Sequence, residues 1–161
     1  MELKFRVAAR IAKPVHEVFE AVADPAQLSH YFTTGGARGR LETGAKVTWD
    51  FHDFPGAFPV DVVEVVQDEK IVLQWQANEG DPPNVDGGEE IKDADYKTTI
   101  TMIFSDLDGG RTKVQIEEAG WRDNAGALKA SYGNCQGWSQ MLCALKAFLE
   151  HGINLREGAY I

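Results

Sequence analysis

The feature that most constrains the fold of this chain is a single long amphipathic segment near its C-terminus. Between Asn134 and Gly152, apolar side chains recur at helical spacing, at Trp138, Met141, Leu142, Leu145, Phe148 and Leu149. At about 100° per residue these positions form one stripe. Asn134 is a residue type that caps the start of a helix, and Gly152 is one that ends it. The segment therefore predicts one long helix whose apolar face needs a partner, with a separate short helix before it over residues 124–132.

Strand-like segments precede that helix, and short turns join most of them. They alternate apolar and polar side chains or are rich in β-branched residues, and they cover residues 3–11, 46–51, 60–66, 70–76, 96–104 and 111–118. A glycine-rich stretch over 33–44 predicts a turn and a short edge strand, and residues 53–59 predict a loop. Strands joined by short turns pair in an antiparallel sheet.

Two short helices are expected between the first strand and the others. Pro14 stands where a first helical residue belongs, and apolar residues follow it at helical spacing. Asp24 and Pro25 end this helix and open a second one that runs through Leu28. The order predicts a single α+β domain over residues 1–161, in which an antiparallel sheet of about six to seven strands grips a long C-terminal helix.

Composition narrows the possible partners and the cellular location. The formal net charge is −9, which would repel nucleic acid and anionic membrane surfaces. The first residues lack the long apolar run of a signal peptide, and no stretch is long enough to span a bilayer, so a cytoplasmic protein is expected. Cys135 and Cys143 would lie about 12 Å apart along one helix, too far for a disulfide, which suits a reducing compartment.

The sequence contains no motif that would assign a cofactor, a metal ion or a catalytic nucleophile. The histidines lack metal-ligand spacing to a second histidine or to cysteine, and no Gly-x-Ser-x-Gly is present, so no metal, cofactor or catalytic residue is assigned. Residues 77–95 are strongly acidic and rich in glycine and proline. They predict a long solvated loop rather than a calcium site, because most of the ligands of a calcium loop are missing.

Three segments together resemble the START-like, Bet v 1-like helix-grip superfamily (SRPBCC). They are residues 18–28 with Tyr31 and Phe32 behind them, residues 44–51, and Gly137-Trp138 with the leucines that follow. The best match is the branch related to the C-terminal domain of the activator of Hsp90 ATPase. The resemblance implies a cavity between sheet and helix. It does not imply one function, since the superfamily hosts lipid carriers, hormone receptors, polyketide cyclases and chaperone activators.

A cavity of this kind would be lined by large apolar side chains. The candidates are Phe32, Trp49, Phe51, Trp75, Trp138, Met141, Leu142 and Leu145, which could equally fill a closed core. Tyr96 or Glu118 is expected to hold the polar end of a ligand. Glu118 and Glu64 lie in phase with apolar neighbours on their strands and could point inward. A buried carboxylate would need a partner such as Arg6, or its pKa would rise.

We therefore expect a domain that binds a small apolar molecule, lipid-like or polyketide-like, without assigned catalysis. Two alternatives stay open. One is a co-chaperone-like module that binds and stimulates an Hsp90-type ATPase, and the other is an enzyme of the cyclase or aromatase kind. The acidic segment 77–95 could shape the mouth of the cavity.

Overall fold

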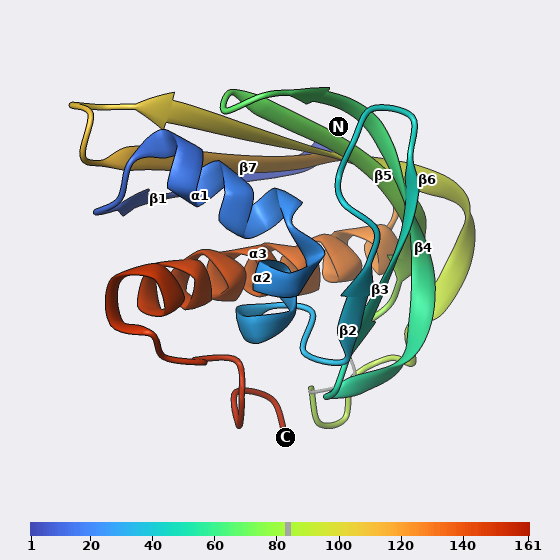
Figure 1. Cartoon of the computed structure of the whole chain (residues 1–161). Helices are drawn as coiled ribbons and strands as arrows, with labels where there is room; N and C mark the ends of the chain where they lie inside the picture. The colour runs from blue at the N-terminus through green and yellow to red at the C-terminus, as the bar shows by residue number, and fades with distance from the viewer. Residues whose placement is uncertain (83–84) are drawn as a thin grey trace.

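Seven antiparallel strands form one curved sheet around a long helix in a computed structural model, which describes residues 1–82 and 85–161 (Figure 1). The strands are β1 (Leu3–Ile11), β2 (Gly36–Arg38), β3 (Lys46–Phe51), β4 (Phe54–Val66), β5 (Lys70–Glu79), β6 (Lys92–Asp106) and β7 (Thr112–Trp121). Their order across the sheet is β1-β7-β6-β5-β4-β3-β2. From β2 to β7 each strand pairs with the next one along the chain, and β1 joins the far edge beside β7. The predicted α+β helix-grip fold is confirmed.

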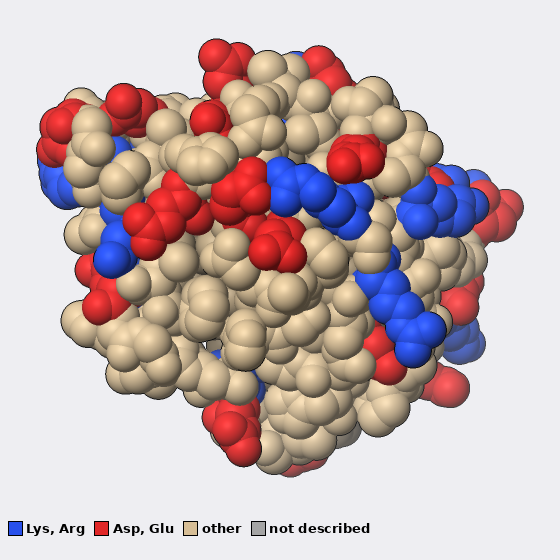
Figure 2. Space-filling view, in the orientation of Figure 1, with Lys and Arg blue, Asp and Glu red and all other residues tan. Residues whose placement is uncertain are grey.

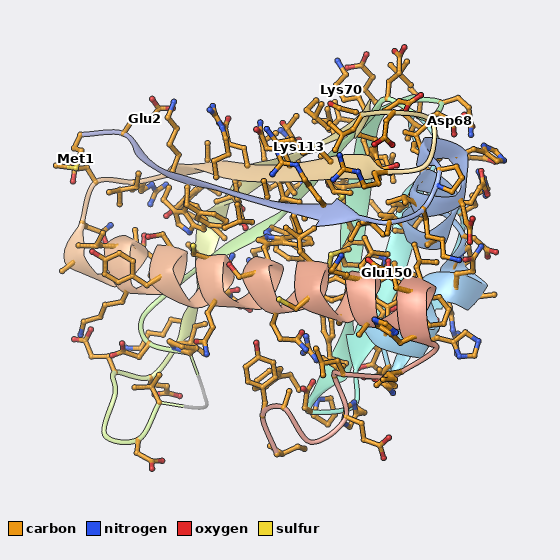
Figure 3. All side chains as sticks on the ribbon, turned by 90° about the vertical axis from the view of Figure 1, so that its left-hand side faces the viewer. Met1, Glu2, Asp68, Lys70, Lys113 and Glu150 are labelled. Atoms are coloured by element: carbon orange, nitrogen blue, oxygen red, sulfur yellow. The ribbon has the colours of Figure 1, made fainter. Side chains whose placement is uncertain are left out.

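Three helices cover the concave side of this sheet. They are α1 (Val15–Ala23), α2 (Pro25–Tyr31) and α3 (Ala125–His151). The helix α3 packs against β1, β5 and β7, and α1 packs against β6. In Figure 3, turned by 90°, α3 runs its full length beside β1, with Met1 and Glu2 near one of its ends and Glu150 near the other. With 27 residues, α3 is about 40 Å long.

Local capping explains where the helices begin and end. The Asp24 carboxylate accepts the Ala26 N–H at 2.9 Å and caps α2, whose first residue is Pro25. The Asn124 side chain accepts the Ala127 N–H at 2.8 Å and caps α3. Gly152 ends α3 in the left-handed conformation, with φ at 67°.

The start of α3 corrects a sequence prediction. A short helix over 124–132 and a second one capped by Asn134 were expected, but residues 125–151 form one helix. Asn124 is the cap, and Asn134 lies inside the helix with its side chain turned to Glu118. Local sequence rules favour both asparagines as caps, and only the contact with a distant strand distinguishes them.

Two predicted loops are also shorter than expected. Residues 54–59 belong to β4 rather than to a loop, and there they pair with β3 alone, since β4 meets β5 only from Asp61 onward. Prolines are tolerated in such a one-sided stretch because a partner is missing on the other side. The expected loop over 77–95 loses both ends to strands, because β5 runs to Glu79 and pairs there with Lys92 of β6.

A continuous apolar core fills the space between the sheet and the helices. Its largest fully buried side chains include Phe19, Tyr31, Trp49 and Trp138. The Tyr31 hydroxyl donates to the Ala21 carbonyl at 2.9 Å, and burial raises the pKa of Tyr31 well above its ordinary value.

On the molecular surface, acidic and basic side chains are interspersed over the upper part of the face in Figure 2. Among the described residues, none of the helices is long and apolar enough to cross a membrane.

Candidate functional site

A cavity of about 180 Å³ opens between α3, the strands β3 to β5 and the segment that follows α3. Its aromatic walls are Phe32, Phe51, Phe54, Trp75, Trp138 and Tyr160. A second hollow of about 390 Å³ adjoins it and shares several of its lining residues, among them Trp75 and Asn134. Figure 1 shows the segment after α3 turning back below the helix toward this end of the sheet. The site is thus built from the sheet, the helix and the C-terminal segment, with Pro82 and Ile91 of the connection between β5 and β6.

The aromatic walls hold one another in place. The rings of Trp75 and Trp138 stack at 5.4 Å with an angle of 24° between their planes. Phe32 lies 5.4 Å from Trp138 and meets Phe51 edge-on at 5.0 Å. Such contacts add stability beyond the burial of area and limit ring motion. The result is a flat-walled, preformed surface suited to an aromatic or planar ligand.

Glu118 is hydrogen-bonded to both tryptophans of the cavity wall but does not itself line the cavity. Its side chain is fully buried, and its oxygens accept the indole N–H of Trp138 at 2.8 Å and that of Trp75 at 2.9 Å. They also accept the Thr98 hydroxyl at 2.7 Å and the Asn134 amide at 3.0 and 3.2 Å. Burial raises the pKa of Glu118, and these hydrogen bonds act in the opposite direction. Because both oxygens are occupied by protein donors, Glu118 orients the cavity walls.

Gly137 leaves space on the cavity side of α3, whereas Gly133, one turn before it, packs close to Pro82. Gly133 and Gly137 both line the cavity. A methyl group added at Gly137 would meet nothing within 4 Å, whereas one at Gly133 would come within 3.2 Å of Pro82. Glycine in the middle of a helix is unfavourable by about 1 kcal/mol relative to alanine. The open space beside Gly137 belongs to the cavity.

A buried ion pair between Arg156 and Asp53 supports the part of the cavity wall next to the C-terminal segment. The Arg156 guanidinium donates to both carboxylate oxygens of Asp53, from Nε and from Nη2, each at 3.0 Å. The two side chains are 4% and 1% exposed. The guanidinium carbon lies 4.7 Å from the ring centroid of Phe51 and 4.9 Å from that of Tyr160. This pair fastens the C-terminal segment to the turn between β3 and β4.

The structure brings together part of the residue set predicted from the sequence. Phe32, Phe51, Trp75 and Trp138 line the cavity. Trp49 lies behind the wall, edge-on to Phe32 and Trp75 at 5.6 and 6.1 Å. The predicted residues that lie in the core and outside the cavity lining are Met141, Leu142 and Leu145.

The two predicted polar anchors have other partners. Glu118 is buried, but it faces its protein donors rather than lining the cavity. The Tyr96 hydroxyl donates to Glu79 at 3.0 Å and accepts the Arg122 N–H at 3.2 Å, also away from the cavity. Their roles toward a ligand remain predictions.

The structure places Arg6 away from Glu118 and leaves Glu64 partly exposed. Arg6 is on the outer face, where its Nη2 lies 2.7 Å from Glu117, because Glu117 and Glu118 point to opposite sides of β7. Glu64 pairs with Lys70 at 3.0 Å and is half exposed. The prediction that Glu64 points inward depended on regular alternation along the strand, and a register shift between Val62 and Glu64 interrupts that alternation.

Several lining residues were not singled out from the sequence. Asn134 was interpreted as a cap, and Phe54 fell in a predicted loop. Arg156 and Tyr160 follow the end of the last helix, where no periodic pattern marks them. Within residues 1–82 and 85–161, there is no group of three His, Cys, Asp or Glu side chains that could hold a metal ion.

Comparisons with known proteins agree with the fold. A family model described as "Activator of Hsp90 ATPase homolog 1-like protein" matches residues 12–150. No curated protein matches the sequence. A crystal structure from Staphylococcus saprophyticus is 22% identical with a TM-score of 0.72, and the match covers 94% of this chain and 95% of that one.

Two further structures carry descriptive titles. The Aha1 dimer from Colwellia psychrerythraea is 17% identical with a TM-score of 0.69, over 93% of this chain and 98% of that one. DynU16, a putative protein in the dynemicin biosynthetic locus, is 21% identical with a TM-score of 0.73, over 95% of this chain and 49% of that one. At these identities the similarity establishes a shared fold.

Proposed function

This chain belongs to the activator of Hsp90 ATPase homolog 1-like family, and we propose that it is a binding domain for a small, flat and largely apolar molecule. The observation that carries the proposal is the aromatic cavity between α3 and the sheet. Its walls are rigid before any ligand arrives, because Trp75 and Trp138 are both hydrogen-bonded to Glu118. Preorganised walls of this kind reduce the entropy lost on binding.

The position of the glycines supports the same proposal. A bulky residue at 137 would fill the cavity, and alanine there would stabilise the helix. The family's fold is shared with a protein of a biosynthetic locus, which is consistent with a lipid-like or polyketide-like ligand made by such a pathway.

The proposal is confined to binding. General acid–base catalysis needs a side chain that can exchange a proton with the ligand. The buried carboxyl groups beside the cavity, Glu118 and Asp53, have both oxygens engaged by protein donors and lie outside the lining. A cyclase-like reaction would need a different group.

A fluorescence titration tests the proposal. N-phenyl-1-naphthylamine, an uncharged naphthalene dye that brightens in apolar surroundings, should bind the wild-type protein saturably. Gly137→Leu places a side chain in the cavity and should weaken binding at least about tenfold, since it takes up space in which the dye would bury apolar area worth about 1.5–3 kcal/mol. Ser139→Leu adds the same side chain at an exposed position of the same helix and should leave the affinity unchanged. Equal affinities of the two variants, or an absence of saturable binding, would overturn the proposal.

Native mass spectrometry of freshly purified protein would then identify the natural ligand. A retained apolar metabolite, released on denaturation, would name its chemical class. Gly137→Leu should lose this mass, and Ser139→Leu should keep it.

A second candidate function is a protein-binding module that stimulates an Hsp90-type ATPase, as the family's description suggests. The observation in its favour is an apolar pair one helical turn apart on the outer side of α3, Leu128 and Tyr132, which are 37% and 67% exposed. Stimulated ATP hydrolysis by Hsp90 that is lost in Leu128→Ser with Tyr132→Ser would support it. An unchanged rate at saturating protein would contradict it.

A further inference from the structure

We infer that the cavity selects ligands with an aromatic body and a neutral carbonyl group at one end, and that the Arg156 guanidinium donates to this carbonyl oxygen. The inference rests on the proposed ligand binding and adds the chemical class of the ligand. It starts from a buried cation whose hydrogen-bonding capacity the protein uses only in part.

The guanidinium of Arg156 has one edge, formed by Nε and Nη2, that is hydrogen-bonded to Asp53, and a second edge at Nη1 that is free to bind a ligand. A guanidinium carries five N–H donors in a planar fork. Asp53 takes the Nε donor and one Nη2 donor, and in the described part of the chain no acceptor contacts Nη1. Arg156 is itself one of the lining residues, so a ligand inside the cavity can reach this free edge. Nη1 is not among the buried side-chain atoms that lack a partner, so it borders accessible space, where a ligand oxygen can take the place of a water molecule.

The surroundings of Arg156 place an aromatic ring beside the acceptor. Its guanidinium carbon lies 4.7, 4.9 and 5.8 Å from the ring centroids of Phe51, Tyr160 and Phe32. Trp138 adjoins Phe32 on the opposite wall. A ligand whose flat body stacks among these rings therefore presents its end group to the guanidinium.

The charges around the cavity favour a neutral acceptor over an anion. The Arg156 charge is already balanced by Asp53, and the pair is almost completely buried. A second buried carboxyl group, Glu118, stands directly behind the tryptophan wall. Asp93 lies on the rim of the adjoining hollow. A ligand carboxylate would add an uncompensated negative charge to this low-dielectric site, whereas a ketone or aldehyde would add none.

Three matched naphthalenes separate these possibilities, with N-phenyl-1-naphthylamine as the displaced reporter. They are 2-acetylnaphthalene, 2-ethylnaphthalene and 2-naphthoate, which share a body and differ in the end group. The wild-type protein should bind the ketone about tenfold more tightly than the ethyl compound, the value of one hydrogen bond to a charged donor. The naphthoate should bind no more tightly than the ketone.

Variants assign the preference to Arg156. Arg156→Lys keeps a charge to pair with Asp53 but removes the free edge, and it should reduce the ratio of ketone to ethyl affinity to about one. The double variant Asp53→Leu with Arg156→Met removes both buried charges and should give the same ratio, which guards against a folding defect in the single variant. Arg122→Lys is the matched control, because Arg122 also lies over an aromatic ring, that of Tyr96, but outside the cavity lining.

The outcomes are distinct. Reporter binding without a ketone preference, a preference for the naphthoate, or a ketone preference that persists in both Arg156 variants would overturn this inference while leaving the proposed binding function intact. Failure of the wild-type protein to bind the reporter or any of the three naphthalenes would overturn the proposed function itself.

Discussion

Replacing Glu118 by glutamine tests whether this buried carboxylate holds the cavity walls. The substitution preserves the shape of the side chain and exchanges one acceptor oxygen for an amide NH₂ group. In the wild-type protein, Oε1 accepts from Trp138 and Asn134, while Oε2 accepts from Trp75, Thr98 and Asn134. Glutamine can reproduce the first set, but its NH₂ group has to occupy the position of Oε2.

The expected loss of stability follows from the donors around Oε2. The Thr98 hydroxyl can rotate and accept a hydrogen bond, whereas the Trp75 indole N–H can only donate. One buried donor is therefore left facing another donor, at a cost of about 1–3 kcal/mol. We expect Glu118→Gln to lower the free energy of unfolding by this amount, a substantial part of the ~5–15 kcal/mol typical of a domain.

The loss should also depend on pH. Burial raises the pKa of Glu118, so the folded state binds this proton more tightly than the unfolded chain does. The contribution of Glu118 to stability is then complete below its unfolded pKa and declines as the pH rises through its folded pKa. Glutamine does not titrate. The difference in unfolding free energy between wild type and Glu118→Gln should be largest near pH 4 and should shrink as the pH is raised.

Urea unfolding between pH 4 and pH 8, followed by tryptophan fluorescence, measures both effects. Glu117→Gln is the control, since Glu117 precedes Glu118 on β7 but faces outward to Arg6, and it should cost less than about 1 kcal/mol. Equal stability of Glu118→Gln and wild type would refute the role assigned to the hydrogen bonds. A difference that stays constant with pH would refute the raised pKa.

Three further substitutions test other parts of the site and core. Gly137→Ala should stabilise the protein by about 0.5–1 kcal/mol in urea unfolding, because the added methyl group meets nothing within 4 Å; a destabilised variant would mean that this space is not open. Arg156→Met should cost about 3–5 kcal/mol by leaving Asp53 buried and unpaired, and the added change Asp53→Leu should recover most of it; equal losses would contradict this explanation. Tyr31→Phe should lower the melting temperature, since the hydrogen bond to the Ala21 carbonyl is worth about 1 kcal/mol, and an unchanged value would argue against that bond.

The fold could be predicted because its main determinants are local patterns in the right order. The apolar stripe that includes Trp138 and Leu145 is buried against the sheet, and the Asp24-Pro25 pair separates α1 from α2. The start of α3 was predicted wrongly because Asn124 and Asn134 carry the same local signal. What distinguishes them is a tertiary contact, the hydrogen bond from Asn134 to Glu118, which no local rule contains.

The site was predictable only where its residues are large and apolar. Trp75 and Trp138 could be selected as wall residues by type and strand or helix phase. Arg156 and Asp53 could not, because they lie 103 residues apart, one beyond the last helix and the other in a turn. Their pairing depends on the path of the C-terminal segment, which is determined by the packed structure rather than by residue periodicity.

The residues that local sequence rules do not explain lie around the cavity. A glycine lies in the middle of α3 with open space beside it, a carboxyl group is buried behind two tryptophans, and an ion pair that includes Arg156 is buried next to the cavity. Stability alone disfavours the glycine and the ion pair, because alanine or a packed apolar pair would be at least as stable there, and it disfavours burying the carboxyl group because of the cost of desolvation. All three border or support the same cavity, through Gly137, Glu118 and Arg156. Departures from local optimality concentrate at functional sites, and this concentration is an argument for a ligand that is independent of the cavity's shape.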